Sequence, residues 1–220
     1  MPRVFRGWRG GRRIAVIMNE SLRERIVEAA LQLAGERSWE RVRLHDVAAR
    51  LTIPLAEIGT CFREKEEIAD AWFDRADRAL LAAAGSPVLE AMTARERFAE
   101  LLMVWLGALA PHRRVTRQIL AGKLEFGHVH YQFAGLLRVS RTVQWLREGA
   151  RLDNPLPWRA LEESALTSIY LLTVLRWLGD ETPGFTATRA LLDRLLKKGE
   201  RLADVAGPWF GRVRPHREAA

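Results

Sequence analysis

Apolar residues recur every three or four positions along most of this chain, which is the spacing of residues on one face of an α-helix. The clearest run is Ile26, Ala29, Ala30 and Leu33, and similar runs follow it almost to the end of the chain. Strict alternation of apolar and polar residues, the pattern of a half-buried strand, is not found. The sequence therefore predicts an all-α protein with about nine helices. They are expected at about 21–36, 44–50, 54–62, 65–84, 94–109, 112–126, 131–148, 159–178 and 186–206.

Several of these helices carry recognisable end signals. Ser21-Leu-Arg-Glu24 and Thr93-Ala-Arg-Glu96 are capping boxes, in which a hydroxyl and a glutamate satisfy backbone amides at a helix start. Gly85-Ser86-Pro87 ends the long fourth helix. We expect four segments along the chain. They are a basic, disordered segment at 1–20, a first helical domain at 21–81, a C-terminal helical domain at 82–206 and a disordered tail at 207–220.

Residues 44–67 contain the stretch around which the rest of the chain is arranged. Two short amphipathic helices are joined there by a tight turn, and Pro54 occupies the first turn of the second helix, where its missing amide costs nothing. Phe62 and Lys65 then lead into a long amphipathic helix. This arrangement is typical of a helix-turn-helix, whose second helix enters the major groove of DNA.

The net charge of +8 is unevenly distributed. Residues 1–17 carry five arginines and no acid, whereas residues 18–73 carry eight basic and eleven acidic side chains. The basic excess therefore does not lie on the predicted helix-turn-helix. Residues 1–17 have three interpretations: a flexible arm that binds phosphate, a targeting peptide, or translated upstream sequence ahead of Met18. We favour the last.

Composition and motifs exclude several classes of protein. The single cysteine, Cys61, rules out an intramolecular disulfide framework and favours a reducing, cytoplasmic location. No apolar run is long enough to predict a membrane span. Motifs for a nucleophile elbow, a Walker loop or a zinc protease are missing, so we expect neither an enzyme nor a cofactor. His128 and His130 are not expected to bind metal, because positions i and i+2 point to different faces of a helix.

The predicted helix-turn-helix resembles that of the TetR family of transcriptional regulators. The resemblance covers about residues 21–81, and its most specific part is Phe62-x-x-Lys65-Glu66 with the spacing behind it. It implies a homodimer through the last two helices, a small-molecule pocket in the C-terminal domain, and ligand-controlled release of a palindromic operator in double-stranded DNA. The matching residues are Arg25, Ile26, Ala29, Ala30, Leu33, Val42, Asp46, Val47, Ala48, Leu51, Ile53, Pro54 and Cys61 to Glu66.

A recognition helix reads base edges mainly through polar side chains, and here it offers few of them. Between residues 55 and 61 only Glu57 and Thr60 are polar. Gly59 stands where the family usually has a tyrosine, and Thr52 replaces the usual turn glycine. Basic residues around the motif are candidates for phosphate contacts. The full set of candidate DNA contacts is Arg43, His45, Leu55, Glu57, Thr60, Arg63 and Lys65.

Large aromatic residues either fill the core or line a pocket for a small hydrophobic effector, and as a set they favour a pocket. The candidates are Trp72, Trp105, Phe126, Tyr131, Trp145 and Trp177. A group of ubiquinone-biosynthesis accessory proteins has a similar fold and binds lipid without reading DNA. Ala110-Pro111-His112-Arg113 and Trp177-Leu178-Gly179-Asp180 resemble that group. A lipid- or hydrophobe-binding protein without operator binding is therefore the alternative function.

Overall fold

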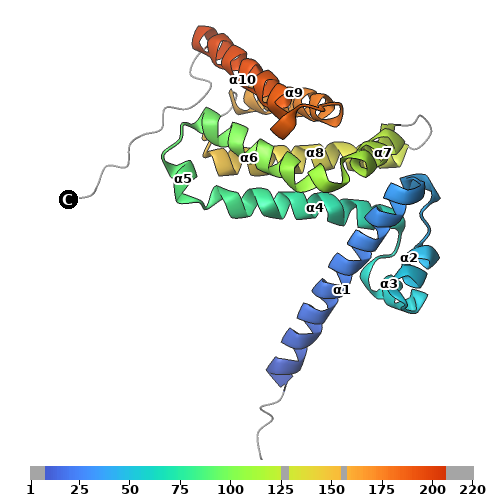
Figure 1. The fold of residues 1–220 in the computed structure, drawn as a ribbon. Coiled ribbons are helices and arrows are strands. Elements are labelled where there is room, and N and C mark those ends of the chain that lie inside the picture. The colour runs from blue at the N-terminus through green and yellow to red at the C-terminus, as the bar shows by residue number, and fades with distance from the viewer. Residues whose placement is uncertain (1–7, 125–128, 155–157, 207–220) are drawn as a thin grey trace, which may run out of the picture. The chain divides into compact units, whose positions relative to one another are not determined.

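The described part of the chain is all-α in the computed structural model, as the sequence predicts (Figure 1). The structure describes residues 8–124, 129–154 and 158–206, with side chains placed for 20–122, 138–154 and 159–202. The tail expected at 207–220 lies outside these ranges. The α-helices are α1 (Trp8–Arg37), α2 (Leu44–Leu51), α3 (Leu55–Cys61), α4 (Lys65–Ala84), α5 (Pro87–Glu90), α6 (Ala94–Leu109), α7 (Arg113–Leu124), α8 (Val129–Ala150), α9 (Trp158–Leu178) and α10 (Thr186–Ala206). Three short 3-10 helices are η1 (Trp39–Arg41), η2 (Ala110–His112) and η3 (Pro183–Phe185).

The two predicted capping boxes have different outcomes. At Thr93 both reciprocal bonds form: the Glu96 amide donates to Thr93 Oγ1 at 3.3 Å, and the Thr93 amide donates to Glu96 Oε2 at 2.8 Å. Ser21 instead lies inside α1, which begins at Trp8. The expectation of disorder up to residue 20 is therefore wrong for Trp8 onwards. A Ser-x-x-Glu sequence is only a local preference, and the stretch from Arg12 to Glu20 contains no residue that breaks a helix.

The chain divides into two compact units, residues 1–73 with 114–122, and residues 74–113 with 123–220. This division differs from the predicted boundary at residue 81 in two ways. The first unit ends earlier, at residue 73 within α4, and it also includes much of α7. Hydrogen bonds explain its place there. Thr116 Oγ1 accepts from Trp72 Nε1 at 3.0 Å, and Gln118 Oε1 accepts from the Trp39 amide at 2.8 Å. Arg114 Nη2 donates to a carbonyl at the end of α1 at 2.7 Å.

The first unit is built on one buried face of α1. Its apolar positions are completely or almost completely buried, as the helical spacing predicts. The short helices α2 and α3 pack against this face. The core residues of this unit include Ile26, Ala30, Leu33, Val47, Ile58, Phe62 and Ile68.

The second unit is centred on α6, which packs against α8 and also contacts α9 and α10. α9 and α10 pack against each other as a helical pair. α6 and α8 approach closely at Gly149, where an added Cβ would lie 2.6 Å from Leu101 Cδ1. The small residue thus permits the backbone of α8 to lie near the buried side chains of α6. No helix in the described ranges is both long and apolar enough to span a bilayer.

Candidate nucleic-acid interface

The turn between α2 and α3 is held by backbone hydrogen bonds rather than by a glycine. Thr52 ends α2 with φ 55° and ψ 45°, a left-handed conformation, and its amide donates to the carbonyls of Ala48 and Ala49. Pro54 precedes α3 in an extended conformation. The helix-turn-helix geometry is therefore formed even though a β-branched residue occupies the left-handed position, which strains the backbone there.

α3 has one buried face and one exposed face. Ile58 is completely buried and Cys61 is 6% exposed, so these two side chains anchor the helix to the first unit. Arg23 of α1 adds to this anchor, because its guanidinium donates to the Cys61 carbonyl and lies 4.2 Å over the ring of Phe62. The exposed face consists of Leu55, Ala56, Glu57, Gly59 and Thr60.

The exposed face of α3 carries methyl groups and one carboxylate. Leu55 is 52% exposed, although it is a large apolar residue. The Thr60 hydroxyl donates to the Glu57 carbonyl at 2.8 Å, so its proton is already used within the helix. A Cβ added at Gly59 would meet no atom within 4 Å. This face therefore offers apolar contact and hydrogen-bond acceptors, and none of its five side chains offers a free donor.

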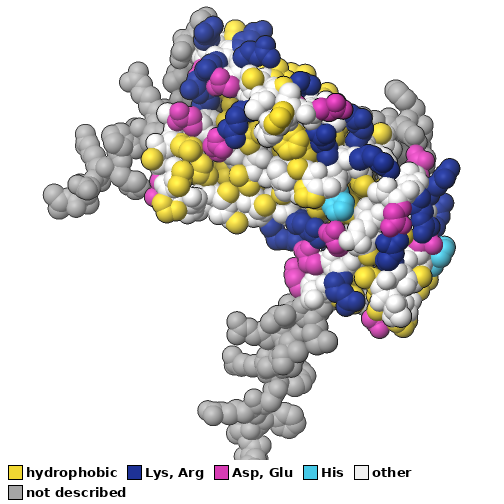
Figure 2. Space-filling model, viewed as in Figure 1, with side chains coloured by type: hydrophobic (Ala, Val, Ile, Leu, Met, Phe, Trp, Pro, Cys, Tyr) yellow, Lys and Arg dark blue, Asp and Glu magenta, His cyan; other side chains and the backbone are white. Residues whose placement is uncertain are grey.

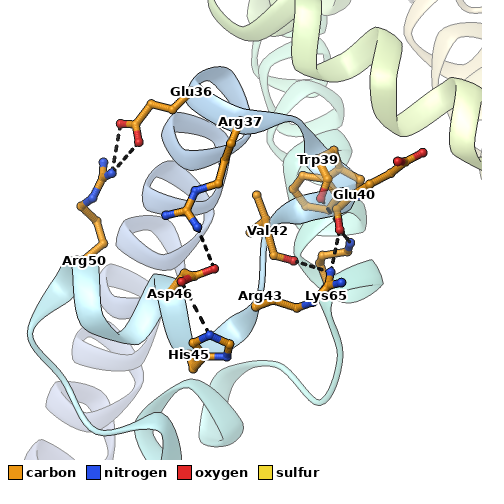
Figure 3. Close-up of polar contacts among 10 residues, drawn as sticks. All are labelled: Glu36, Arg37, Trp39, Glu40, Val42, Arg43, His45, Asp46, Arg50 and Lys65. Carbon is orange, nitrogen blue, oxygen red and sulfur yellow. Dashed lines mark hydrogen bonds and ion pairs between the residues drawn. The ribbon is translucent and has the colours of Figure 1, made fainter.

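Two of the candidate cations are engaged with the η1 turn. Arg43 Nη1 donates to the Glu40 carbonyl at 2.6 Å, and Lys65 Nζ donates to the Trp39 and Glu40 carbonyls at 3.2 and 3.4 Å (Figure 3). The Lys65 ammonium also lies 5.5 Å from the centre of the Trp39 ring. Burial lowers the pKa of Lys65. Both side chains thus converge on one carbonyl and stabilise the connection between α1 and α2.

The remaining candidates are more exposed. The backbone amide of Arg63 donates to Glu67 Oε2 at 2.7 Å, which leaves its exposed guanidinium outside that bond. His45 is exposed on α2, and its Nε2 lies 3.6 Å from Asp46, which also accepts from Arg37 (Figure 3). Basic and acidic side chains are interspersed on the visible surface, without a large face of one sign (Figure 2). The positive potential around α3 therefore depends on a few arginines.

The predicted effector-pocket residues lie in different surroundings. Trp72, Trp105 and Trp177 are at most 2% exposed, whereas Trp145 is 38% exposed. Trp72 belongs to the first unit, and the other three belong to the second. Phe126 and the side chain of Tyr131 lie outside the described residues, so the six-residue pocket stays a prediction.

Two surface hollows in the second unit are lined by other residues. One, of about 370 Å³, lies between α8 and α9. The other, of about 300 Å³, lies at the end of α8. Their linings include Ser140, Gln144, Glu163 and Thr167 in the first case and Arg147, Arg151, Asn154 and Arg159 in the second. None of the predicted aromatic residues lines either hollow.

A buried polar cluster in the second unit was missed in the sequence. Asp77, 5% exposed, accepts hydrogen bonds from Trp105 Nε1 at 2.7 Å and Thr142 Oγ1 at 3.0 Å, and Arg138 Nη2 lies 3.3 Å away. Tyr170 packs edge-on against Trp105, with ring centres 5.5 Å apart. Burial, reinforced by the charge of Asp77, raises the pKa of Tyr170. The available signal was an aspartate beside the apolar helical positions Ala76 and Leu80.

His128 and the side chain of His130 lie outside the described residues. Among the residues that are described, no group of three or more metal-binding side chains comes together.

The helix-turn-helix and the helical unit that follows it define a class of regulatory proteins, and comparison with solved structures identifies the family. The chain is 49% identical to a TetR transcriptional regulator from Nitrosomonas europaea, covering 81% of this chain and 97% of that one, with a TM-score of 0.73. This chain belongs to the TetR family of transcriptional regulators. A TetR transcriptional regulator from Rhodococcus sp. RHA1, 20% identical over 80% of this chain and 97% of that one, shares the fold with a TM-score of 0.58.

A second comparison concerns the C-terminal end alone. Residues 164–203 match the COQ9 family model, and this range covers most of α9 and α10. A search of the curated proteins found no match.

Proposed function

We propose that this chain is a DNA-binding transcriptional regulator whose affinity for an operator is controlled by a small hydrophobic effector. The observation that carries this proposal is the exposed face of α3 within a complete helix-turn-helix. Family membership supports it, because the relative from Nitrosomonas europaea is itself a TetR transcriptional regulator. α3 would enter the major groove, as the second helix of such motifs does.

The basic residues around α3 divide into two roles. Arg63 contacts phosphate directly, because its guanidinium is exposed at the end of α3. Arg43 and Lys65 stabilise the η1 turn by donating hydrogen bonds to the carbonyls of Trp39, Glu40 and Val42. Only the N–H groups that are not used in these bonds can contact phosphate. His45 is a weaker contact on the exposed side of α2.

The effector site that we propose lies in the second unit, around the buried cluster of Asp77, Arg138 and Thr142. Ligand sites combine apolar walls with a few convergent polar groups, and Trp105 with Tyr170 supplies apolar wall beside this cluster. The effector would therefore be hydrophobic and carry a hydrogen-bonding group. It lowers DNA affinity only if it binds one conformation of the protein more tightly than the other.

A homodimer through α9 and α10 is part of the same proposal. Five leucines on these helices are 42 to 62% exposed, which leaves an apolar surface for a second copy. Such a dimer would present two α3 helices to successive major grooves, about 34 Å apart. The exposed leucines are Leu161, Leu171, Leu172, Leu175 and Leu202.

Selection from a random duplex DNA library with the purified protein tests the regulatory function. The proposal expects enrichment of an inverted repeat with half-sites about one helical turn apart. An unenriched library after repeated rounds, at a salt concentration that permits binding, would contradict it.

The alternative is a hydrophobe-binding protein without operator binding, and the COQ9 match over residues 164–203 favours it. Native mass spectrometry of the freshly purified protein distinguishes the two functions. A hydrophobic ligand that copurifies with a protein inactive in DNA selection supports the alternative. A protein that selects an inverted repeat and carries no such ligand contradicts it.

A further inference from the structure

The exposed chemistry of α3 also restricts which bases it can recognise. We infer that this helix reads its half-site through thymine methyl groups, contacted by Leu55 and Ala56, and through a cytosine amino group, contacted by Glu57. The inference rests on the proposed function, because it presumes that α3 lies in a major groove. It goes further by specifying the base edges.

The exposed face of α3 lacks side chains with a free hydrogen-bond donor. Guanine presents two acceptors in the major groove, and adenine presents one acceptor beside its amino group, so bidentate recognition of either purine uses a donor side chain. The Thr60 proton is committed to the Glu57 carbonyl at 2.8 Å, and the other exposed side chains of α3 have no N–H or O–H group. Recognition of purines by this face is therefore disfavoured.

The apolar side chains and the carboxylate on α3 are complementary to the groups that pyrimidines present in the major groove. Thymine presents a methyl group in the major groove, which Leu55 and Ala56 can cover with apolar surface. Cytosine presents an amino donor, for which a carboxylate is the complementary acceptor. Glu57 would be repelled by phosphate and by the N7 acceptor that lies beside the amino group of adenine, so a cytosine amino group is the favourable partner for it in DNA.

The groups on α3 that would contact bases are accessible. Leu55 is 52% exposed, so its side chain contributes little to the core of the first unit. Gly59 leaves the helix backbone bare on the same side, since a Cβ there would meet no atom within 4 Å. A close approach of the helix to the groove floor, which short methyl contacts need, is therefore sterically open.

The experiment uses the duplex selected by the full-length protein, with each thymine of the half-site replaced in turn by deoxyuridine. This replacement removes only the methyl group. Burial of one methyl group corresponds to about a fourfold change in affinity. We expect that loss for the wild type at one or two positions, measured by fluorescence anisotropy.

Variants assign the contacts. Leu55→Ala should weaken binding to the thymine duplex and remove the difference between thymine and deoxyuridine at one position, with an unchanged circular dichroism spectrum. Val88→Ala, at a residue that is 66% exposed on α5, is the matched control and should keep the difference. Glu57→Gln should shift the preferred base at one position from cytosine to adenine, because glutamine pairs with adenine.

The outcomes separate the two claims. A library that yields no motif contradicts the proposed function together with this inference. A clear motif whose deoxyuridine duplexes bind as tightly as their thymine counterparts overturns the inference and leaves the regulatory function standing. A half-site whose base preference is unchanged at every position by Glu57→Gln overturns it as well.

Discussion

Individual residues in this protein occupy conformations and surroundings that are unusual for their type. Thr52 adopts a left-handed conformation, and Asp180 is fully buried, with its carboxylate accepting hydrogen bonds from Thr182 and Thr188. Both lie at connections between helices, where the backbone must change direction. Their energetic consequences can be measured by single substitutions.

Replacing Thr52 with glycine should stabilise the protein. A left-handed conformation costs an L-residue roughly 1–2 kcal/mol, and glycine avoids this cost. Glycine also loses more conformational entropy on folding, which opposes the stabilisation by roughly 0.5–1 kcal/mol. Thr52→Gly should therefore raise the free energy of unfolding by about 0.5–1 kcal/mol in a urea titration. Thr52→Ala keeps the Cβ and should give no such gain. An equal gain from both substitutions would contradict the strain assigned to Thr52.

Replacing Asp180 with asparagine should reduce stability in a pH-dependent way. Burial acts to raise the pKa of Asp180, but hydrogen bonds from Thr182 and Thr188 outweigh it and hold the pKa below its ordinary value. The folded-state pKa is thus lower than the unfolded one, so the stabilisation is present above about pH 4 and is lost as the pH falls through the folded-state pKa. At pH 7, Asp180→Asn should cost about 2–3 kcal/mol.

Thermal unfolding of the wild type and of Asp180→Asn between pH 7 and pH 2.5 tests whether this stabilisation is lost at low pH. The difference in midpoint temperature should shrink below about pH 4. A difference that stays constant over the whole range would exclude a linkage to this carboxylate.

At the scale of the elements, most helices could be predicted from the sequence, because apolar spacing and end signals are local. α6 and α10 begin and end where expected. The early start of α1 could not be predicted, since a capping-box sequence does not require a helix end. The polar contacts of Asp77 were also out of reach, because Thr142 lies 65 residues away. The burial of Ile58 and Cys61 on α3, and the Thr60 hydrogen bond, could not be predicted, because the short sequence of α3 does not show which side faces the core.

The pairing of α8 with α9 contains a buried ion pair that offers a further test. Arg147 Nε donates to Glu162 Oε1 at 2.7 Å, and both side chains are at most 3% exposed. Removing one partner leaves a buried charge, so Arg147→Met or Glu162→Leu alone should cost about 3–5 kcal/mol in chemical denaturation. The double variant should lose less than the sum of the two.

The exposed pair of Lys197 with Asp193 on α10 is the control, and Lys197→Ala should change stability little. Strict additivity of the Arg147 and Glu162 substitutions would show that the two charges do not stabilise each other.

At the scale of the whole molecule, the proposed regulator requires a dimer. A charge at the centre of an apolar interface is strongly unfavourable, so Leu175→Glu should convert the dimer to a monomer in light scattering after size exclusion. Leu175 is 62% exposed, so the substitution should leave the fold of the monomer intact. Val88→Glu on α5 should leave the oligomeric state unchanged. A dimer that survives Leu175→Glu would place the interface elsewhere.

The dependence of DNA affinity on salt concentration tests sequence-specific binding most directly. Fluorescence anisotropy would compare the selected duplex with a scrambled duplex, for the wild type and for Arg63→Ala. We predict a preference of at least about 10³-fold for the selected duplex at physiological salt. Arg63→Ala should weaken binding to both duplexes and reduce the salt slope by about one. Equal affinities and equal slopes on the two duplexes would contradict sequence-specific DNA binding by this protein.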